Sequence, residues 1–293
     1  MKALRIILVF CTAVCVSYLL AADISELTRQ AENGDANAQF NLAVKYYFGE
    51  DIEQNYDNAF FWMKKSAEQG EVAAEYNLAY MYQLGDGIEK NIDLAREWYE
   101  KAAEKEYQKA KVSLGYMYYD GNGVEQDFEK AVALFQDAAK DGLMRAQYAL
   151  GYMYMQGEGV EKSEEKAIQW FEKSAEQGEV NSEFFLADIL YRGEDVKNDT
   201  VRAFYLFLDL ATNTKDNEAQ YYLALMYLKG HGTERDPEKA FYWMSQSAEL
   251  EFIDAQFELA KMYYNGMGVQ QDSSLGDQWQ EEAELNELFE YLW

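Results

Sequence analysis

The strongest constraint on the fold is a leucine that recurs with a period of 36 residues. It stands at Leu42, Leu78, Leu114, Leu150, Leu186, Leu223 and Leu259. One inserted residue between Thr212 and Asn217 accounts for the single step of 37 residues. Periods of about 20–50 residues are typical of repeat proteins, in which each unit is one supersecondary element that buries its apolar face against its neighbours. We therefore expect a solenoid.

Glycines mark the turns inside each repeat. Pairs of the form Gly-x-Gly occur in the same phase at Gly85/Gly87, Gly121/Gly123, Gly157/Gly159, Gly230/Gly232 and Gly266/Gly268, and Gly49 and Gly193 keep only the first glycine. Single glycines close the other half of four units, at Gly34, Gly70, Gly142 and Gly178. Glycine supplies the positive φ that ends a helix in a tight turn. The glycine pattern therefore predicts two helices in each unit, with a glycine turn between them.

A polar residue begins the second helix of every unit. These residues are Asn55, Asn91, Asp127, Ser163, Asp199, Asp236 and Asp272. Their side-chain oxygens can accept from free amides of the first turn, a contribution of about 1 kcal/mol each. The single proline, Pro237, follows Asp236 at the first helical position, where a missing N–H does no harm.

Apolar spacing predicts which positions form the core. The first helix is expected to bury Ala38, Leu42, Ala43 and Tyr46 on one face. The second helix is expected to bury alanine and aromatic positions, namely Ala59, Trp62 and Ala67 in one unit and Ala95, Trp98 and Ala103 in the next.

These patterns resemble the Sel1-like repeats, relatives of the tetratricopeptide repeats. The resemblance is carried by strings such as 146–154 (AQYALGYMY), 157–160 (GEGV), 166–171 (KAIQWF) and 175–178 (AEQG). It implies an all-α fold, a right-handed α/α solenoid of about seven helix-turn-helix repeats. It also implies a protein-interaction adaptor rather than an enzyme.

The chain is expected to divide into a signal peptide, seven repeats and two caps. The predicted segments are a signal peptide at 1–22, a capping half-repeat at 23–34, repeats at 35–70, 71–106, 107–142, 143–178, 179–215, 216–251 and 252–287, and a capping tail at 288–293. Apolar spacing at Leu285, Leu288, Phe289, Leu292 and Trp293 suggests that the end of the chain covers the last unit. The alternative is a docking or dimerisation helix.

The first 22 residues have the layout of a secretory signal peptide. Lys2 and Arg5 precede an apolar run over 6–20, and Ala21-Ala22 precede the first acid. We expect cleavage after Ala22 and export to the periplasm or the medium; the alternative is an uncleaved anchor helix. Both cysteines, Cys11 and Cys15, lie in this segment, so the mature chain has no disulfide and no thiolate nucleophile.

The net charge and the absence of catalytic motifs argue against several classes of function. Asp and Glu number 53 against 26 Lys and Arg, a formal charge of −27, which opposes binding to nucleic acid or to anionic membranes. The only histidine, His231, stands in a glycine turn, and no spacing supplies a catalytic triad. The pairs Glu50-Asp51 and Glu194-Asp195 suit either a solvated surface or a cation, without the ligand spacing of a calcium loop. We therefore expect no catalysis, no cofactor and no metal.

Two other functions stay open. The resemblance includes relatives associated with β-lactam binding or hydrolysis, but their disulfides have no counterpart here. A luminal adaptor in protein quality control is the other alternative. Neither is favoured by any motif in the sequence.

Tyrosines on the first helices predict where a partner binds. The residues facing away from the second helices include an aromatic row expected to be half-buried, Phe40, Tyr76, Tyr148, Phe184, Tyr221 and Phe257. Two further rows are the candidate contact residues, Tyr80, Tyr116 and Tyr152 in one, and Tyr47, Tyr119, Tyr191 and Tyr264 in the other. Packing alone is the alternative for these tyrosines. We expect a monomer whose concave groove binds a peptide or protein with basic and apolar side chains, for example a host or envelope protein.

Overall fold

The structure is a computed structural model that describes residues 24–193 and 198–290. Over these ranges the chain is helical, with short turns and no strand. It divides into two compact bodies, with the boundary in the sequence between Ala146 and Gln147. We call the part up to Ala146 the N-terminal body and the rest the C-terminal body. The predicted signal peptide lies outside the described residues.

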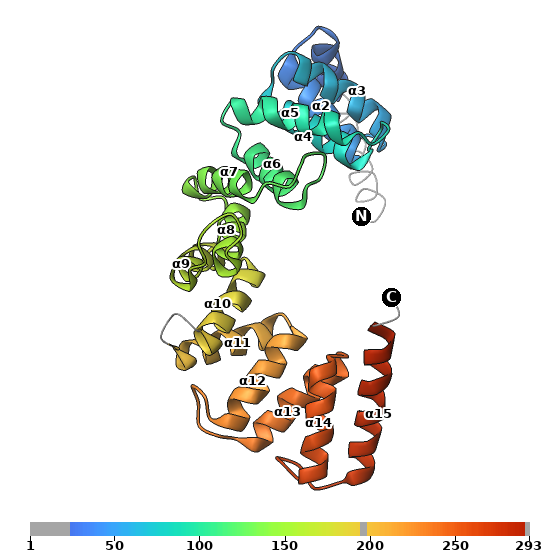
Figure 1. The fold of residues 1–293 in the computed structure, drawn as a ribbon. Helices are drawn as coiled ribbons and strands as arrows, with labels where there is room; N and C mark the ends of the chain where they lie inside the picture. Colours follow the sequence, from blue (N-terminus) through green and yellow to red (C-terminus); the bar gives the residue numbers. More distant parts are fainter. Residues whose placement is uncertain (1–23, 194–197, 291–293) are drawn as a thin grey trace, which may run out of the picture. The chain divides into compact units, whose positions relative to one another are not determined.

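Each body is a series of helices that pack against their neighbours in the chain. The N-terminal body contains a helix over 24–32, then α2 (Ala36–Phe48), α3 (Tyr56–Glu68), α4 (Val72–Leu84), α5 (Ile92–Glu104), α6 (Gln108–Asp120), α7 (Phe128–Lys140) and the first residues of α8 (Met144–Gln156) (Figure 1). The C-terminal body contains the rest of α8, then α9 (Glu164–Ala175), α10 (Val180–Arg192), α11 (Thr200–Asn213), α12 (Asn217–Lys229), α13 (Pro237–Glu249), α14 (Ile253–Asn265) and α15 (Ser273–Glu290). The predicted all-α solenoid is confirmed.

The first turn glycine ends the first helix of the unit in the left-handed conformation. Gly49, Gly85, Gly121, Gly230 and Gly266 adopt it as C-caps, with φ between 65° and 89°. Gly193 does not: its φ is −29°, so the prediction of a positive φ at this position is wrong. The sequence after Gly193 lacks the second glycine of the repeat pattern.

The second turn glycines Gly87, Gly232 and Gly268 lie against the backbone of the preceding unit. A Cβ on Gly87 would stand 2.1 Å from the carbonyl oxygen of Tyr56, the first residue of α3. The same contact recurs at 2.0 Å between Gly232 and Thr200. A side chain at either position would overlap main-chain atoms. Glycine is therefore required here for the close approach of consecutive units as well as for its conformation.

The second helix is held on the first by its polar cap, as predicted. Asn55, Asn91, Asp127, Ser163, Asp199 and Asp236 each accept a hydrogen bond from the amide three residues later, and Asp272 accepts from the amides of Ser274 and Leu275. The cap's own amide donates to a carbonyl near the end of the first helix, for example Asn55 to Tyr46 and Asp236 to Tyr227, each at 2.9 Å. Each turn is therefore fixed from both sides.

The core follows the repeat, with corrections at its edges. Ala38, Leu42 and Ala43 are buried, whereas Tyr46 is half-buried. On the second helices the predicted alanines Ala59, Ala67 and Ala95 are buried, and Ala103 is half-buried.

The tryptophans are less buried than expected. Trp62 and Trp98 are half-buried, and the next residues, Met63 and Tyr99, take the core position. The buried arc of the helix is thus rotated by one residue, because it centres on the side of α3 and α5 that faces the first helices. The tryptophans lie at its edge, where lysine Nζ atoms cover the ring of Trp98 at 3.6 Å and that of Trp170 at 4.2 Å.

A polar pair recurs between the start of the first helix and the end of the second. Gln69 donates to the buried Gln39, Gln177 to Gln147 and Asn286 to Gln256, always 30 residues apart. In the second unit the pair is ionic, Lys105 with Glu75 at 2.7 Å. In the third unit the buried Lys111 binds Asp137 on α7 and Glu106 in the preceding unit. Buried polar groups are tolerated when they are paired in this way.

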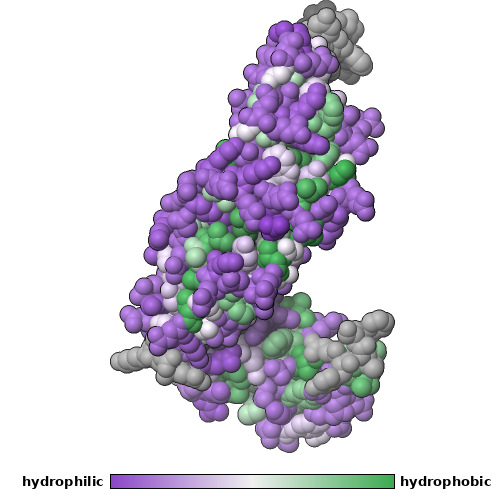
Figure 2. Space-filling view, turned by 45° about the horizontal axis from the view of Figure 1, so that its top comes forward, coloured by the Kyte–Doolittle hydropathy of each residue, from purple (hydrophilic) through white to green (hydrophobic). Residues whose placement is uncertain are grey.

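The two ends differ from each other. At the N-terminal end, Ala31 in the helix over 24–32 is buried against Ala38 and Leu42. At the other end, Leu285, Leu288 and Phe289 on α15 are 53–57% exposed, so these side chains do not cover the last unit as expected. The predicted tail residues Leu292 and Trp293 lie outside the described residues. Figure 2 shows hydrophobic patches between hydrophilic residues on one face.

No helix within the described ranges is long and apolar enough to span a bilayer.

In some units the residue after the second helix is not glycine. Glu106, Lys215 and Glu251 adopt φ between 56° and 63° where other units have Gly34, Gly70, Gly142 and Gly178, whose positive φ was predicted and is confirmed. A non-glycine residue in this conformation costs about 1–2 kcal/mol. These three positions are therefore local sources of strain.

We predict that Glu251→Gly raises the free energy of unfolding by about 1 kcal/mol, because glycine removes this strain. Gly142→Ala should lower it by about 1–2 kcal/mol, since its φ is +86° and open space surrounds the added Cβ. Urea denaturation measures both changes. Equal stability of the three proteins would contradict the conformational explanation.

We further predict a larger effect for Gly87→Ala. The φ of Gly87 is +69°, so alanine there has the same unfavourable backbone conformation as at Gly142. The added methyl group also overlaps the Tyr56 carbonyl, and the two effects together should lower the free energy of unfolding by about 2–5 kcal/mol. Gly142→Ala is the matched control, because it adds the same methyl group without the overlap. If the two variants lose the same stability, consecutive units do not depend on this contact.

Half-buried carboxylates are expected to make the C-terminal body sensitive to pH. Burial, and next the nearby Asp209, raises the pKa of Glu183. Burial, and next the nearby Asp216, raises the pKa of Glu218. A carboxylate whose pKa is higher in the folded state destabilises the fold above that pKa, and the loss disappears as the pH falls toward the ordinary value near 4.

We therefore predict that Glu218→Gln and Glu183→Gln melt at a higher temperature than the unsubstituted protein at pH 7 and at the same temperature at pH 4. Thermal melts followed by circular dichroism across this range provide the measurement. The exposed Glu234→Gln is the control, and it should change neither melt. A melting-temperature difference between variant and parent that is larger at pH 4 than at pH 7 would contradict a raised pKa.

Candidate functional site

The candidate site is a pocket of the N-terminal body with a volume of about 640 Å³. Its walls come from α4, α5, α6, the turn after α6 and the first residues of α8. Four tyrosines line it, Tyr76, Tyr80, Tyr99 and Tyr116. Apolar surface from Val112 and Met117 completes the wall on α6, so the pocket combines aromatic faces with hydroxyl groups.

Helix periodicity brings the tyrosines of α4 into the pocket. Tyr76 and Tyr80 are four residues apart and lie on one face of the helix. Tyr76 packs on Tyr99 with ring centroids 5.6 Å apart, and on Tyr107 at 5.3 Å. The wall is therefore a cluster of rings that hold one another in place.

Hydrogen bonding and packing fix two other rings of the pocket. The Tyr99 hydroxyl donates to Oε1 of Gln83 on α4 at 2.7 Å, which ties α5 to α4. Burial raises the pKa of Tyr99, so this hydroxyl stays protonated at physiological pH. The Tyr116 ring meets Phe135 edge-on at 5.0 Å.

Two of the predicted contact residues, Tyr80 and Tyr116, therefore meet in one pocket. Tyr80 is 41% exposed, and Tyr116 is half-buried. The first aromatic row is half-buried throughout, as predicted, at Phe40, Tyr76, Tyr148, Phe184, Tyr221 and Phe257.

The remaining candidates in the N-terminal body take part in turn structure. The hydroxyl of Tyr47 donates to Oδ2 of Asp86 in the next turn at 2.6 Å, and its ring packs on Tyr56 at 5.2 Å. The Tyr119 ring packs on Phe128, the first residue of α7, at 5.3 Å. Both rings brace the junction between a first and a second helix.

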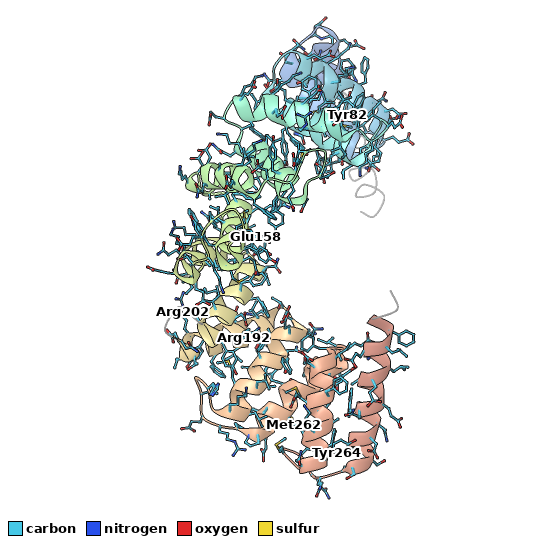
Figure 3. The ribbon with its side chains drawn as sticks, in the orientation of Figure 1. Tyr82, Glu158, Arg192, Arg202, Met262 and Tyr264 are labelled. Atoms are coloured by element: carbon cyan, nitrogen blue, oxygen red, sulfur yellow. The ribbon has the colours of Figure 1, made fainter. Side chains whose placement is uncertain are left out.

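The candidates in the C-terminal body are dispersed. Tyr152 packs on Phe185 at 5.7 Å. Tyr191 contacts Phe207, Tyr222 and His231, with ring centroids 5.8–6.4 Å apart. Tyr264, labelled on α14 in Figure 3, donates to Oδ1 of Asp277 at 2.9 Å.

The histidine and the first acidic turn lie within the described ranges. His231 is exposed beside Tyr191. Asp51 is ion-paired with Lys45 at 2.9 Å, whereas Glu194-Asp195 lies outside the described residues. No group of three potential metal ligands occurs in the described part of the chain.

Two cations of the pocket were missed from the sequence. Lys109 and Arg145 line it at the start of α6 and α8. They occupy the same position in consecutive repeats, 36 residues apart, and that periodicity is the signal that could have found them. Arg145 lies over the Tyr116 ring, with its Cζ 5.7 Å from the centroid.

Comparison with known proteins connects this architecture to one family. The Sel1 repeat model matches at 36–71, 72–107, 108–143, 145–179, 180–211, 217–252 and 253–279. A protective antigen with an SLR fold, present in uropathogenic Escherichia coli strains, is 33% identical with a TM-score of 0.82 over 89% of this chain. This chain spans only 56% of the length of that protein.

A Sel1 repeat protein from Oxalobacter formigenes is 30% identical with a TM-score of 0.69, over 84% of this chain and 96% of its own. No curated protein matches the sequence. The family matches cover most of the chain, and the fold agrees with both solved structures. The chain therefore belongs to the Sel1 repeat family, whose members generally act as non-catalytic scaffolds for protein–protein interaction.

Proposed function

We propose that this protein is an exported, non-catalytic interaction scaffold that binds a peptide segment of a partner protein in the tyrosine pocket. The observation that carries the proposal is the convergence of Tyr76, Tyr80, Tyr99 and Tyr116 on one cavity of about 640 Å³. Pockets of roughly 300–1,000 Å³ with mainly apolar walls and a few polar groups are the usual form of a binding site.

Two tyrosines of the pocket wall are held in place by neighbouring side chains. Tyr99 is fully buried and hydrogen-bonded to Gln83, and Tyr76 is packed between two rings. A rigid aromatic wall loses little conformational entropy when a partner binds, which favours affinity. Tyr80 supplies the accessible face, since much of its side chain is in contact with solvent.

The chemistry of the walls favours binding over reaction. Tyr99 and Gln83 are used in a hydrogen bond, Tyr76 and Tyr116 make ring contacts, and Asp120 is the carboxylate of the lining. Tyrosine rings with polar tips recognise peptide side chains well, because they offer a large contact area together with a hydrogen-bonding group.

Substitution at the pocket tests the proposal. Tyr80→Ala together with Tyr116→Ala should lower recovery of crosslinked partners from the source organism about tenfold or more, since interface tyrosines each contribute more than about 1 kcal/mol. Crosslinking followed by quantitative mass spectrometry provides the measurement. The melting temperature of the variant must stay close to that of the parent, because Tyr116 also packs on Phe135.

The matched control is Tyr205→Ala together with Tyr242→Ala. These tyrosines lie on α11 and α13 and are 63% and 55% exposed, so the control removes the same two rings outside the pocket. It should leave recovery unchanged. If the two double variants retain the same partners, the pocket is not the binding site.

Export is the second part of the proposal. It is supported by the basic start, the apolar run over 6–20 and the Ala21-Ala22 pair. We predict that protein recovered from the periplasm or the medium begins at Asp23, as N-terminal sequencing and intact mass would show. Retention of residues 1–22 on a membrane-bound protein would identify an anchor instead.

A further inference from the structure

The charges of the pocket indicate what kind of peptide it binds, an inference that rests on the proposed function. Lys109 and Arg145 are each the second residue of their helix, α6 and α8. Because the two positions are one repeat apart, the cations lie at equivalent places on consecutive first helices. Both line the pocket, whereas Asp120 is its single acidic lining residue.

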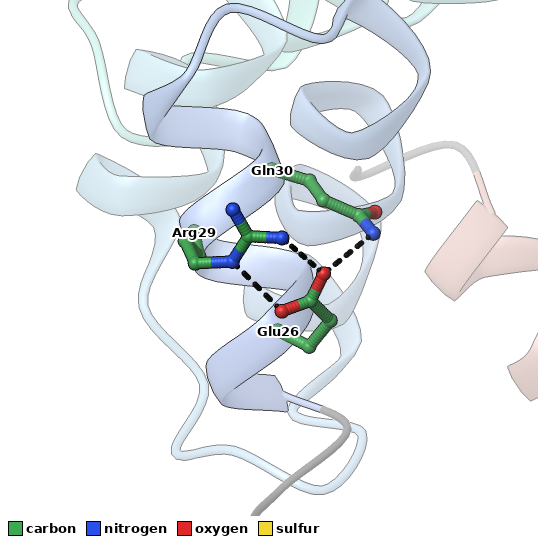
Figure 4. A network of polar contacts seen from close by, with 3 residues as sticks. All are labelled: Glu26, Arg29 and Gln30. Carbon is green, nitrogen blue, oxygen red and sulfur yellow. Dashed lines mark hydrogen bonds and ion pairs between the residues drawn. The ribbon is translucent and has the colours of Figure 1, made fainter.

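Arg145 differs from the other described arginines. Arg29 binds Glu26 through two nitrogens, at 2.8 and 2.6 Å (Figure 4), and Arg96 binds Glu100 at 2.9 Å. Arg192 and Arg202, labelled in Figure 3, bind Asp188 and Glu172. Arg235 donates to the Leu228 carbonyl at 3.0 Å.

Within the described ranges, neither Arg145 nor Lys109 forms an ion pair. The chain has 53 acids for 26 bases, so carboxylate partners are abundant elsewhere. Arg145 contacts an aromatic ring instead, the face of Tyr116. Its guanidinium edge is therefore available for a planar acceptor, and carboxylates bind such an edge through two parallel hydrogen bonds.

Stability does not explain these two cations. The first turn of a helix carries the positive end of the helix dipole, where acids are favourable and cations are unfavourable. The N-cap of α6, Tyr107, provides no side-chain hydrogen bond, and the nearest acid in the sequence, Glu106, is paired with Lys111 rather than with Lys109. Two consecutive repeats thus place an unpaired cation where the helix itself disfavours one. A negatively charged ligand would reverse this electrostatic penalty.

The pocket also has a direction. Asp120 is the last residue of α6, 11 residues after Lys109, which corresponds to about 16 Å along the helix axis. An anion is attracted to the end where α6 and α8 begin and repelled from the end where α6 finishes. The tyrosines Tyr76, Tyr80 and Tyr116 supply the aromatic wall of the same cavity.

We infer that the pocket binds an acidic peptide, with an aromatic or aliphatic side chain among the tyrosines and an adjacent carboxylate on Arg145 and Lys109. The carboxylate can belong to an aspartate or glutamate side chain or to a free peptide C-terminus. The net charge of −27 makes acidic peptides unattractive to the rest of the surface, so their binding depends on these two cations.

Selection from random nine-residue peptides tests the inference. One library is tethered at the N-terminus, so its peptides end in a free carboxylate, and the other is tethered at the C-terminus. We expect both selections on the purified protein to enrich an acidic residue next to an aromatic or aliphatic one. Enrichment only in the library with free carboxylates would assign the anion to the peptide C-terminus.

Individual enriched peptides then report on the cations through fluorescence polarisation. Arg145→Gln should weaken binding about tenfold and Lys109→Gln severalfold, whereas Arg145→Lys should retain part of the affinity because it keeps the charge. The matched control is Arg235→Gln, which removes a distant arginine and should have no effect. Raising the salt concentration should weaken binding to the parent more than binding to Arg145→Gln.

The outcomes separate this inference from the proposed function. Enrichment of basic or uncharged peptides, or affinities of Arg145→Gln and Lys109→Gln within twofold of the parent, would overturn the inference and leave a peptide-binding pocket in place. Failure of both libraries to enrich any peptide would overturn the inference together with the peptide-binding function. All three glutamine variants remove exposed cations without core contacts, and melting temperatures close to that of the parent verify their folding.

Discussion

The close approach of one unit's turn to the backbone of the preceding unit is the constraint on which the solenoid depends. Gly87 reaches the carbonyl of Tyr56, and Gly232 reaches that of Thr200, at distances that leave no room for a side chain. Because the contact joins main chain to main chain, it sets the spacing of consecutive units independently of their side chains. In the third unit, whose first helix α6 lines the pocket, Gly123 lies instead against the side chain of Ile92, the first residue of α5.

Regular spacing also explains why a surface of variable residues can act as a site. The N-caps and the buried leucines repeat in every unit, and they fix where each helix begins and which face is buried. Positions outside this set are free to differ, as Lys109 and Arg145 differ from Asn37 and Ala73 at the same place in earlier repeats. Specificity can therefore be added locally without altering the scaffold.

Much of this structure could be predicted from the sequence, because period, glycine turns and caps are local signals that recur. The half-burial of the first aromatic row was also predictable, whereas the burial of Met63 and Tyr99 in place of Trp62 and Trp98 was not, since it depends on how helices rotate against each other. The composition of the pocket could not be fully predicted for the same reason. Tyr80 and Tyr116 were identified from one helix face, but Tyr99 enters the pocket from a second helix. Total charge favoured a basic partner, and only the geometry isolates two unpaired cations.

The polar pairs 30 residues apart bear on how such an array changes in length. Gln39 and Gln69 belong to one unit, and Gln39 otherwise donates to a backbone carbonyl, that of Ala31, which any preceding unit would supply. A unit of this type can be duplicated or lost without leaving the buried side-chain amide of Gln39 without a hydrogen-bond partner. The third unit differs, because its buried Lys111 binds Glu106 in the unit before it as well as Asp137 in its own. Loss of the second unit would therefore leave this buried lysine with one carboxylate partner instead of two.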